Sequence, residues 1–104
     1  MAQISGGDVK HIVVGCEAGM GSSVMLANML ARQLKKLGVK VTHCPVNQLP
    51  ESDADLIVCH RGLSQRAKSA ANGRVVIPFD MFLGDPILAR LADDLENNRN
   101  ISDD

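Results

Sequence analysis

The sequence predicts a three-layer α/β fold, in which a four-stranded parallel sheet of flavodoxin-like order 2-1-3-4 carries helices on both faces. Two observations predict this fold. Short segments rich in Val, Ile and Leu alternate with stretches whose apolar residues recur at helical spacing. Gly, Pro or Asn-Gly separates many of these segments. Strands that alternate with helices form right-handed crossovers, which place the strands parallel in one sheet covered on both faces.

The first strand is predicted over residues 11–15 and the first helix over residues 22–37. The apolar residues of this helix share one face: Leu26, Leu30, Leu34 and Leu37. Ser22 or Ser23 can cap the start of the helix, because a serine hydroxyl accepts a hydrogen bond from a backbone N–H of the first turn. Gly38 follows the last turn, where glycine commonly ends a helix.

The remaining elements are predicted by the same signals: strands over residues 39–44, 55–59 and 74–78, and helices over residues 63–71 and 86–97. Pro86 suits the first turn of the last helix, and Asp85 before it suits a capping position. Pro45 and Pro50 punctuate the segment after the second strand, for which we predict no regular element.

These elements define one domain over residues 11–97, with a loose N-terminus over residues 1–10 and a frayed tail over residues 98–104. A chain of 104 residues buries roughly 65% of its unfolded surface, which is enough for one core without a metal or a disulfide. The sequence contains no internal repeat, linker or low-complexity tract.

The charge and the aromatic content argue against several classes of function. The net charge is −1 and the isoelectric point is about 6.3, so nothing attracts nucleic acid or an anionic membrane by bulk electrostatics. The sequence has no Trp or Tyr and two Phe, so it lacks the platforms on which bases stack. Its apolar runs are far shorter than the roughly 20 residues that cross a bilayer, so we expect no direct membrane insertion.

The three cysteines are an odd number and no secretory leader precedes them, so we expect a reduced, cytoplasmic protein. Cys44 and Cys59 fall in or at the ends of predicted strands, where packing explains them. His11, His43 and His60 are scattered, and they form no ligand spacing with a cysteine. We therefore expect neither a metal nor a cofactor.

The chemistry of the chain is expected at Cys16, which ends the first strand. A loop with two glycines, Gly19 and Gly21, follows it and leads into the first helix. Backbone N–H groups at a helix N-terminus bind phosphate, and the same field lowers the pKa of a thiol and favours the thiolate. The sequence therefore predicts a cysteine that takes up a phosphoryl group and holds it. Met20, near the middle of this loop, can contact a protein partner.

Other candidate residues follow the third and fourth strands. In an open parallel sheet, ligands lie beyond the carboxyl ends of the strands. His60 and Arg61 should meet Cys16 at this edge, together with Phe79 and Asp80. Arginine suits a dianionic phosphoryl group through its charge and its fork of donors, so Arg61 and His60 are candidate accessory residues.

The loop resembles a known motif, the phosphocysteine loop of enzyme IIB domains in the bacterial phosphoenolpyruvate-dependent sugar phosphotransferase system. The resemblance lies in the run Cys16-Glu17-Ala18-Gly19-Met20-Gly21-Ser22-Ser23 and is closest to the mannitol class, which often has aspartate in place of Glu17. Residues 55–67 and 82–86 are also similar to characteristic stretches of mannitol-type domains, so the likeness covers nearly the whole chain after residue 10.

This resemblance implies a role for each matching position. Cys16 would accept a phosphoryl group from a phosphohistidine on a IIA protein and pass it to a sugar alcohol bound in a membrane-embedded IIC transporter. The residues that would hold the phosphoryl group follow the cysteine: Glu17, Ala18, Gly19, Met20, Gly21, Ser22 and Ser23. Mannitol-type proteins often fuse IIB to IIC, so we expect this chain to be either a free-standing IIB or an excised domain.

Two other classes remain open. Low-molecular-weight protein-tyrosine phosphatases and arsenate reductases resemble IIB proteins in fold and in their cysteine phosphate loop, and Asp85-Pro86 resembles the pair that supplies the general acid in such phosphatases. They place an arginine six residues after the cysteine, however, where this chain has Ser22. The second class is a regulatory IIB-like module whose phosphorylation is read by a partner. A nucleotide-binding P-loop is disfavoured, because the Lys-Ser/Thr ending of that motif is missing.

Overall fold

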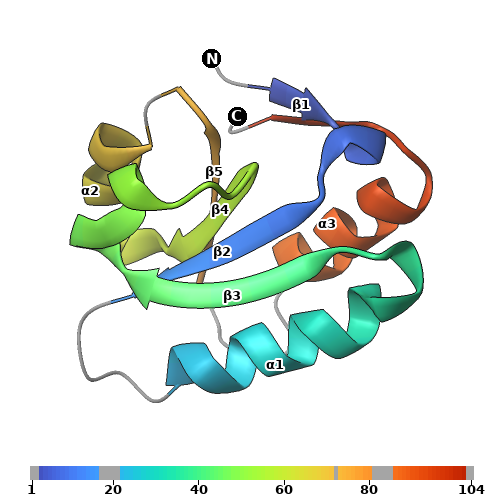
Figure 1. Cartoon of the computed structure of the whole chain (residues 1–104), viewed down its shortest axis with the longest axis horizontal. Coiled ribbons are helices and arrows are strands. Elements are labelled where there is room, and N and C mark those ends of the chain that lie inside the picture. Colours follow the sequence, from blue (N-terminus) through green and yellow to red (C-terminus); the bar gives the residue numbers. More distant parts are fainter. Residues whose placement is uncertain (1–2, 17–21, 72, 81–85, 103–104) are drawn as a thin grey trace.

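The computed structural model of the chain describes residues 3–16, 22–71, 73–80 and 86–102. Its centre is a parallel sheet of four strands in the order β3-β2-β4-β5 (Figure 1). The strands are β2 (His11–Cys16), β3 (Lys40–Pro45), β4 (Leu56–His60) and β5 (Val75–Phe79). This is the predicted order, so the fold class and the flavodoxin-like arrangement are confirmed.

Helices cover both faces of the sheet, as predicted. The longer helices α1 (Ser22–Leu34) and α3 (Pro86–Glu96) lie on one face (Figure 1). The short helix α2 (Ser64–Ala70) lies on the other. Single 3-10 turns complete the connections: η1 (Gly6–Asp8), η2 (Lys35–Leu37) and η4 (Arg61–Leu63).

Side chains that alternate along each strand divide the interior into two clusters, because successive residues of a strand point to opposite faces. On β2, Ile12 and Val14 pack with α1 and α3, whereas Val13 packs with α2. Each of the first four residues of β4, Leu56 to Cys59, is 0% exposed. Apolar residues on both faces are typical of a strand in a covered parallel sheet.

The first helix ends earlier than the periodicity predicts. Residues 22–37 were predicted as one helix, but the α-helix stops at Leu34 and the chain continues as the 3-10 turn η2. Gly38 ends that turn with a φ of 72°, in the left-handed region that glycine enters at low cost. The predicted role of Gly38 as a terminating glycine is confirmed.

The segment after β3 holds an element that the sequence does not reveal. Residues Val46–Glu51 form the 3-10 helix η3, which begins directly after Pro45 and contains Pro50. Val46 and Leu49 of this helix are 3% and 0% exposed, and they cover the same face of the sheet as α2. This 3-10 helix and the short helix α2 thus cover that face together.

The two ends of the described chain correct one expectation. The N-terminus was expected to be loose and the tail frayed, but β1 (Gln3–Ser5) pairs antiparallel with β6 (Asn100–Ser102) (Figure 1). Ile4 lies opposite Ile101 in this pair, and Ile101 is 3% exposed within the larger cluster. Burial of these apolar side chains stabilises three-residue strands that have little strand propensity of their own.

Arg74, just before β5, joins three segments on the α2 side of the sheet. Its Nε donates to the carbonyl oxygen of Ala71 at 2.7 Å. Its Nη1 donates to the carbonyls of Ser52 and Ala54 at 2.8 and 3.0 Å, and its Nη2 donates to that of Leu49 at 2.7 Å. One guanidinium thus donates to four backbone carbonyls, one in η3 and three in the connections before β4 and β5.

The replacement Arg74→Met should therefore lower the free energy of unfolding by about 3 kcal/mol, because it removes four hydrogen bonds to partly buried carbonyls. Urea unfolding of the variant measures this loss. The control is Arg32→Met, on the exposed side of α1, which should change stability by no more than about 0.5 kcal/mol. Equal stability of the two variants would show that the four hydrogen bonds contribute nothing net.

Candidate functional site

The carboxyl ends of three strands meet at one edge of the sheet, as the sequence predicts. Cys16 ends β2 and lies in register with Pro45 of β3, while Gly15 pairs with Cys59 of β4. One residue further along β4, His60 pairs with the last residue of β5, Phe79. The backbone therefore brings Cys16 and His60 to the same edge on neighbouring strands. This is the edge at which open α/β sheets bind ligands.

The segment that follows Cys16 connects this edge to the start of a helix. Helix α1 begins at Ser22, so five residues separate it from β2. The predicted phosphoryl-binding residues of that segment lie outside the described residues: Glu17, Ala18, Gly19, Met20 and Gly21. The predicted cap Asp85 lies outside them as well. Ser22 and Ser23 form the first turn of α1, the end of a helix that attracts anions.

His60 is held in place by two neighbours. Its Nδ1 accepts a hydrogen bond of 3.1 Å from the backbone N–H of Gly62, which caps the turn η4. Its ring meets that of Phe79 edge to face, with centroids 5.8 Å apart and planes at 88°. Because Nδ1 is the acceptor, the proton of the neutral imidazole is on Nε2.

Arg61 forms an ion pair that sequence reasoning did not identify. Its Nε donates to Oδ1 of Asp80 at 2.7 Å, and its Nη2 donates to Oδ2 at 3.4 Å. The pair bridges the ends of β4 and β5, and about half of each side chain is exposed. The structure thus places Arg61 at the predicted edge, with its guanidinium paired to the carboxylate of Asp80. The position of Asp80 directly after the fourth strand was the available signal.

An apolar surface lies on the first turns of α1, close in sequence to the segment after Cys16. Met25 is 63% exposed and Val24 is 37% exposed, whereas the next two residues, Leu26 and Ala27, are buried. These are the two large apolar side chains that the described residues expose to this extent. The sequence pointed to Met20 as a partner contact and overlooked this pair, although the run Val24-Met25 departs from a strict helical pattern.

The described cysteines differ in exposure. Cys59 is 0% exposed, and burial raises the pKa of its thiol to about 11, although the charge of Lys68 acts in the opposite direction. At neutral pH Cys59 is therefore a neutral core side chain rather than a nucleophile. Cys44 is half-buried and packs against the same cluster.

Two further observations concern the described residues alone. Among them, no group of three or more His, Cys, Asp or Glu side chains could hold a metal ion. None of the helices in the described part of the chain is long and apolar enough to cross a membrane.

The fold and the site define a parallel α/β protein with a cysteine at the end of an inner strand, just before a helix. A family model described as "PTS system, Lactose/Cellobiose specific IIB subunit" matches residues 11–92. The chain belongs to this family, whose members are phosphotransferase components of bacterial sugar transport systems. The predicted resemblance to IIB components is thereby confirmed.

Curated relatives carry mannitol-specific names. The chain is 40% identical over 93 residues to a mannitol-specific EIICBA component of Pasteurella multocida, covering 88% of this chain and 15% of that protein. It is 38% identical over 97 residues to a mannitol-specific EIICB component of Bacillus subtilis, covering 91% of this chain and 20% of that protein. The chain is 44% identical over 80 residues to a mannitol-specific EIICB component of Geobacillus stearothermophilus, covering 75% of this chain and 17% of that protein. The chain thus spans a fifth or less of these relatives.

A solved structure supports the fold. The lactose-specific IIB component domain from Streptococcus pneumoniae superposes with a TM-score of 0.56, covering 86% of this chain and 94% of that one. Its sequence identity is 18%, so the likeness extends to the arrangement of strands and helices and not to specificity.

The environment of Cys59 leads to a test of thiol reactivity. At pH 8, a pKa of about 11 leaves about one thiol in a thousand ionised. In the native protein, iodoacetamide should therefore alkylate Cys59 at least about 100 times more slowly than in urea-unfolded protein. Peptide mapping after timed alkylation measures both rates, with the half-buried Cys44 as an internal comparison. Rapid native labelling of Cys59 would contradict the buried placement.

Proposed function

We propose that Cys16 is the phosphoryl carrier of a mannitol-type phosphotransferase system. It accepts the group from a phosphohistidine on a IIA protein and donates it to a sugar or sugar alcohol bound in a membrane-embedded IIC transporter. The observation that carries this proposal is the position of Cys16, which ends an inner strand at the carboxyl edge of the sheet, with five residues between it and α1. Membership of the IIB family supports it independently.

The transfer consists of two displacements at phosphorus. In the first, the Cys16 thiolate attacks the phosphoryl group, an S–P bond forms and the N–P bond to the donor imidazole breaks. In the second, a hydroxyl oxygen of the sugar attacks, an O–P bond forms, the S–P bond breaks and the thiolate leaves; the hydroxyl proton passes to a base on the acceptor side. Such transfers need in-line positioning and charge stabilisation more than covalent help from the protein.

The residues around Cys16 supply that stabilisation in our proposal. Backbone N–H groups from Glu17 to Ser23 and the positive end of α1 hold the phosphoryl oxygens and keep the thiol ionised. A hydroxyl of Ser22 or Ser23 adds a donor. His60 and Arg61 are accessory residues, and the ion pair with Asp80 holds Arg61 at the end of β4.

The relatives favour a sugar alcohol over a disaccharide as the final acceptor. The full-length relatives at 38–44% identity are named mannitol-specific, whereas the lactose-specific domain shares 18% of its residues. Their names combine the C and B components in one protein, which supports a IIC partner for this chain. We therefore place the chain at the cytoplasmic face of the membrane, bound through IIC and not inserted.

A phosphatase or arsenate reductase is the weaker candidate. Hydrolysis of a phosphocysteine needs a cation that stabilises charge in the transition state, and the position six residues after the cysteine is Ser22. Arg61 is the described arginine at this edge, and Asp80 engages it at 2.7 Å. A regulatory IIB-like module would use the same cysteine, so transfer to a sugar separates it from the relay.

The replacement Cys16→Ser should abolish the transferable phosphoryl adduct, because a serine hydroxyl remains un-ionised at neutral pH. The protein is incubated with phosphoenolpyruvate, enzyme I, HPr and a mannitol-class IIA, and its intact mass is measured. The controls Cys44→Ser and Cys59→Ser should still gain one phosphoryl group. A labile adduct on the Cys16 variant would refute the assignment, and turnover of an aryl phosphate by the unmodified chain would favour the phosphatase.

The exposed side chains of α1 provide a test of partner docking. Met25→Glu should lower kcat/KM for transfer from IIA about tenfold, because it places a charge on an apolar contact surface. The matched control, Gln33→Glu at the other end of α1, adds the same charge at an exposed position and should change kcat/KM less than twofold. Rapid-quench kinetics with phosphorylated IIA measures kcat/KM for both variants. Equal kcat/KM for Met25→Glu and Gln33→Glu would exclude this surface from the interface with IIA.

A further inference from the structure

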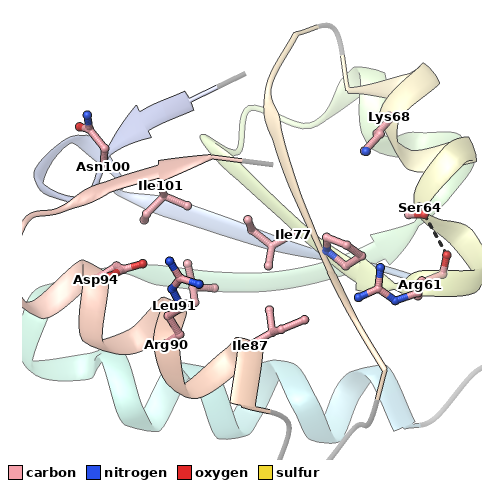
Figure 2. A pocket seen from close by; sticks show the side chains of 11 residues that line it. Arg61, Ser64, Lys68, Ile77, Ile87, Arg90, Leu91, Asp94, Asn100 and Ile101 are labelled. Carbon is pink, nitrogen blue, oxygen red and sulfur yellow. Dashed lines mark hydrogen bonds between the residues drawn. The ribbon is translucent and has the colours of Figure 1, made fainter. Parts of the chain in front are cut away.

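A cavity of about 310 Å³ lies along the outer edge of β5, away from the end of β2. It extends from the turn η4 after β4 to strand β6, with α2 and α3 at its sides (Figure 2). Its apolar wall includes Ile77, Leu91 and Ile101, and all three side chains are at most 8% exposed. Its volume lies at the lower end of the range of small-molecule sites.

Cationic side chains surround this apolar wall. Arg61 and Lys68 approach from the α2 side and Arg90 from α3, on opposite sides of Ile77 (Figure 2). One acidic side chain lines the same space, Asp94, and it contacts Arg99 at 3.4 Å. The lining is therefore net positive in a chain whose net charge is −1.

The cations differ in their existing partners. Arg61 is paired with Asp80, as described above. Arg90 and Lys68 are exposed, and within the described part of the chain neither forms an ion pair. Cations that have no carboxylate partner among the described residues, next to an apolar wall, are complementary to an anion that carries an apolar group.

The edge of β5 is poorly suited to a partner strand, which is the other occupant such a groove could take. Pro78 lines the cavity and has no backbone N–H, so β5 lacks one ladder donor. A proline in an edge strand is typical of edges protected against strand addition. The observations therefore favour a small ligand over an extended peptide.

We infer that this cavity binds a small organic anion, a carboxylate or phosphate head on an apolar body, with Arg90 holding the head, Lys68 adding to the positive lining and Ile77 and Leu91 contacting the body. The site does not depend on Cys16 and goes beyond the phosphoryl relay. Its ligand is held at the α3 side of the sheet edge, next to the Arg61–Asp80 pair that joins the ends of β4 and β5.

Phenylphosphonate is a suitable probe, because it joins an apolar ring to an anionic head and its C–P bond prevents phosphoryl transfer. Titration followed by amide NMR should give saturable shifts at residues 64–68 and 87–91, with a Kd of about 1 mM. Arg90→Gln should weaken this binding about tenfold. The matched control Lys40→Gln removes an exposed cation from the opposite edge strand β3 and should change Kd less than twofold.

Two comparisons make the test decisive. Benzyl alcohol, which has the ring without the charge, should bind at least about ten times more weakly than phenylphosphonate. Shifts confined to the neighbourhood of Cys16, equal Kd values for Arg90→Gln and Lys40→Gln, or equal binding of the neutral probe would each overturn the proposal. The NMR map separates this cavity from the phosphoryl loop. A failure of the cavity proposal would therefore leave the proposed relay through Cys16 intact.

Discussion

The structure depends above all on the parallel pairing of β2 with both of its neighbours. This register places Gly15 between Cys44 of β3 and Cys59 of β4 and brings Cys16 to the carboxyl edge. A side chain at Gly15 would begin at van der Waals contact, since an added Cβ would lie 3.5 Å from Leu49 and Val46 and 3.7 Å from Cys59. A single methyl group would thus fit against η3 at this point, whereas a side chain larger than alanine would press on Leu49 and Val46 just before the cysteine.

The ends of β4 and β5 carry charged side chains, whereas the first turns of α1 expose apolar ones. Where β4 and β5 end, His60 packs against Phe79, and the next residues form the Arg61–Asp80 pair. Helix α1, which begins after the five residues that follow β2, exposes the apolar side chains of Val24 and Met25 on its first turns. A protein that passes a charged group between two partners needs both features, because apolar contact supplies affinity and nearby charges orient the group.

Hydrophobic periodicity sufficed to predict the elements that bury large apolar faces. The strands around Val13 and Ile57 and the helix around Leu30 repeat their pattern over enough residues to identify the element, with boundaries shifted by a residue or a few. The 3-10 helix Val46–Glu51 has no such period and contains a proline, so its sequence indicates only a break between regular elements. Strands β1 and β6 are three residues long, too short for alternation to be read.

For the site, the sequence predicted which residues share an edge of the sheet but not the partners of their side chains. Strand order alone brings Cys16 and His60 to one edge, and the sequence contains that order. The partners of individual side chains depend on register and turn geometry, which the sequence does not display. Arg74 binds four carbonyl groups, and backbone acceptors have no signature in the residue types around them. The pairing of Arg61 with Asp80 likewise requires that β4 and β5 end level with each other.

In the proposed relay, position rather than residue type distinguishes Cys16 from the other two of the three cysteines of this chain. Cys59 lies one register step inside the edge, where burial raises the pKa of its thiol to about 11 and keeps it protonated. Cys44 lies on the other side of Gly15 and packs against the same cluster. Cys16 is a single residue further along β2, at the point where the sheet ends and the field of α1 begins. The proposed relay rests on that one step, which takes the thiol from a buried position that suppresses the thiolate to the segment before a helix N-terminus, the kind of site that favours it.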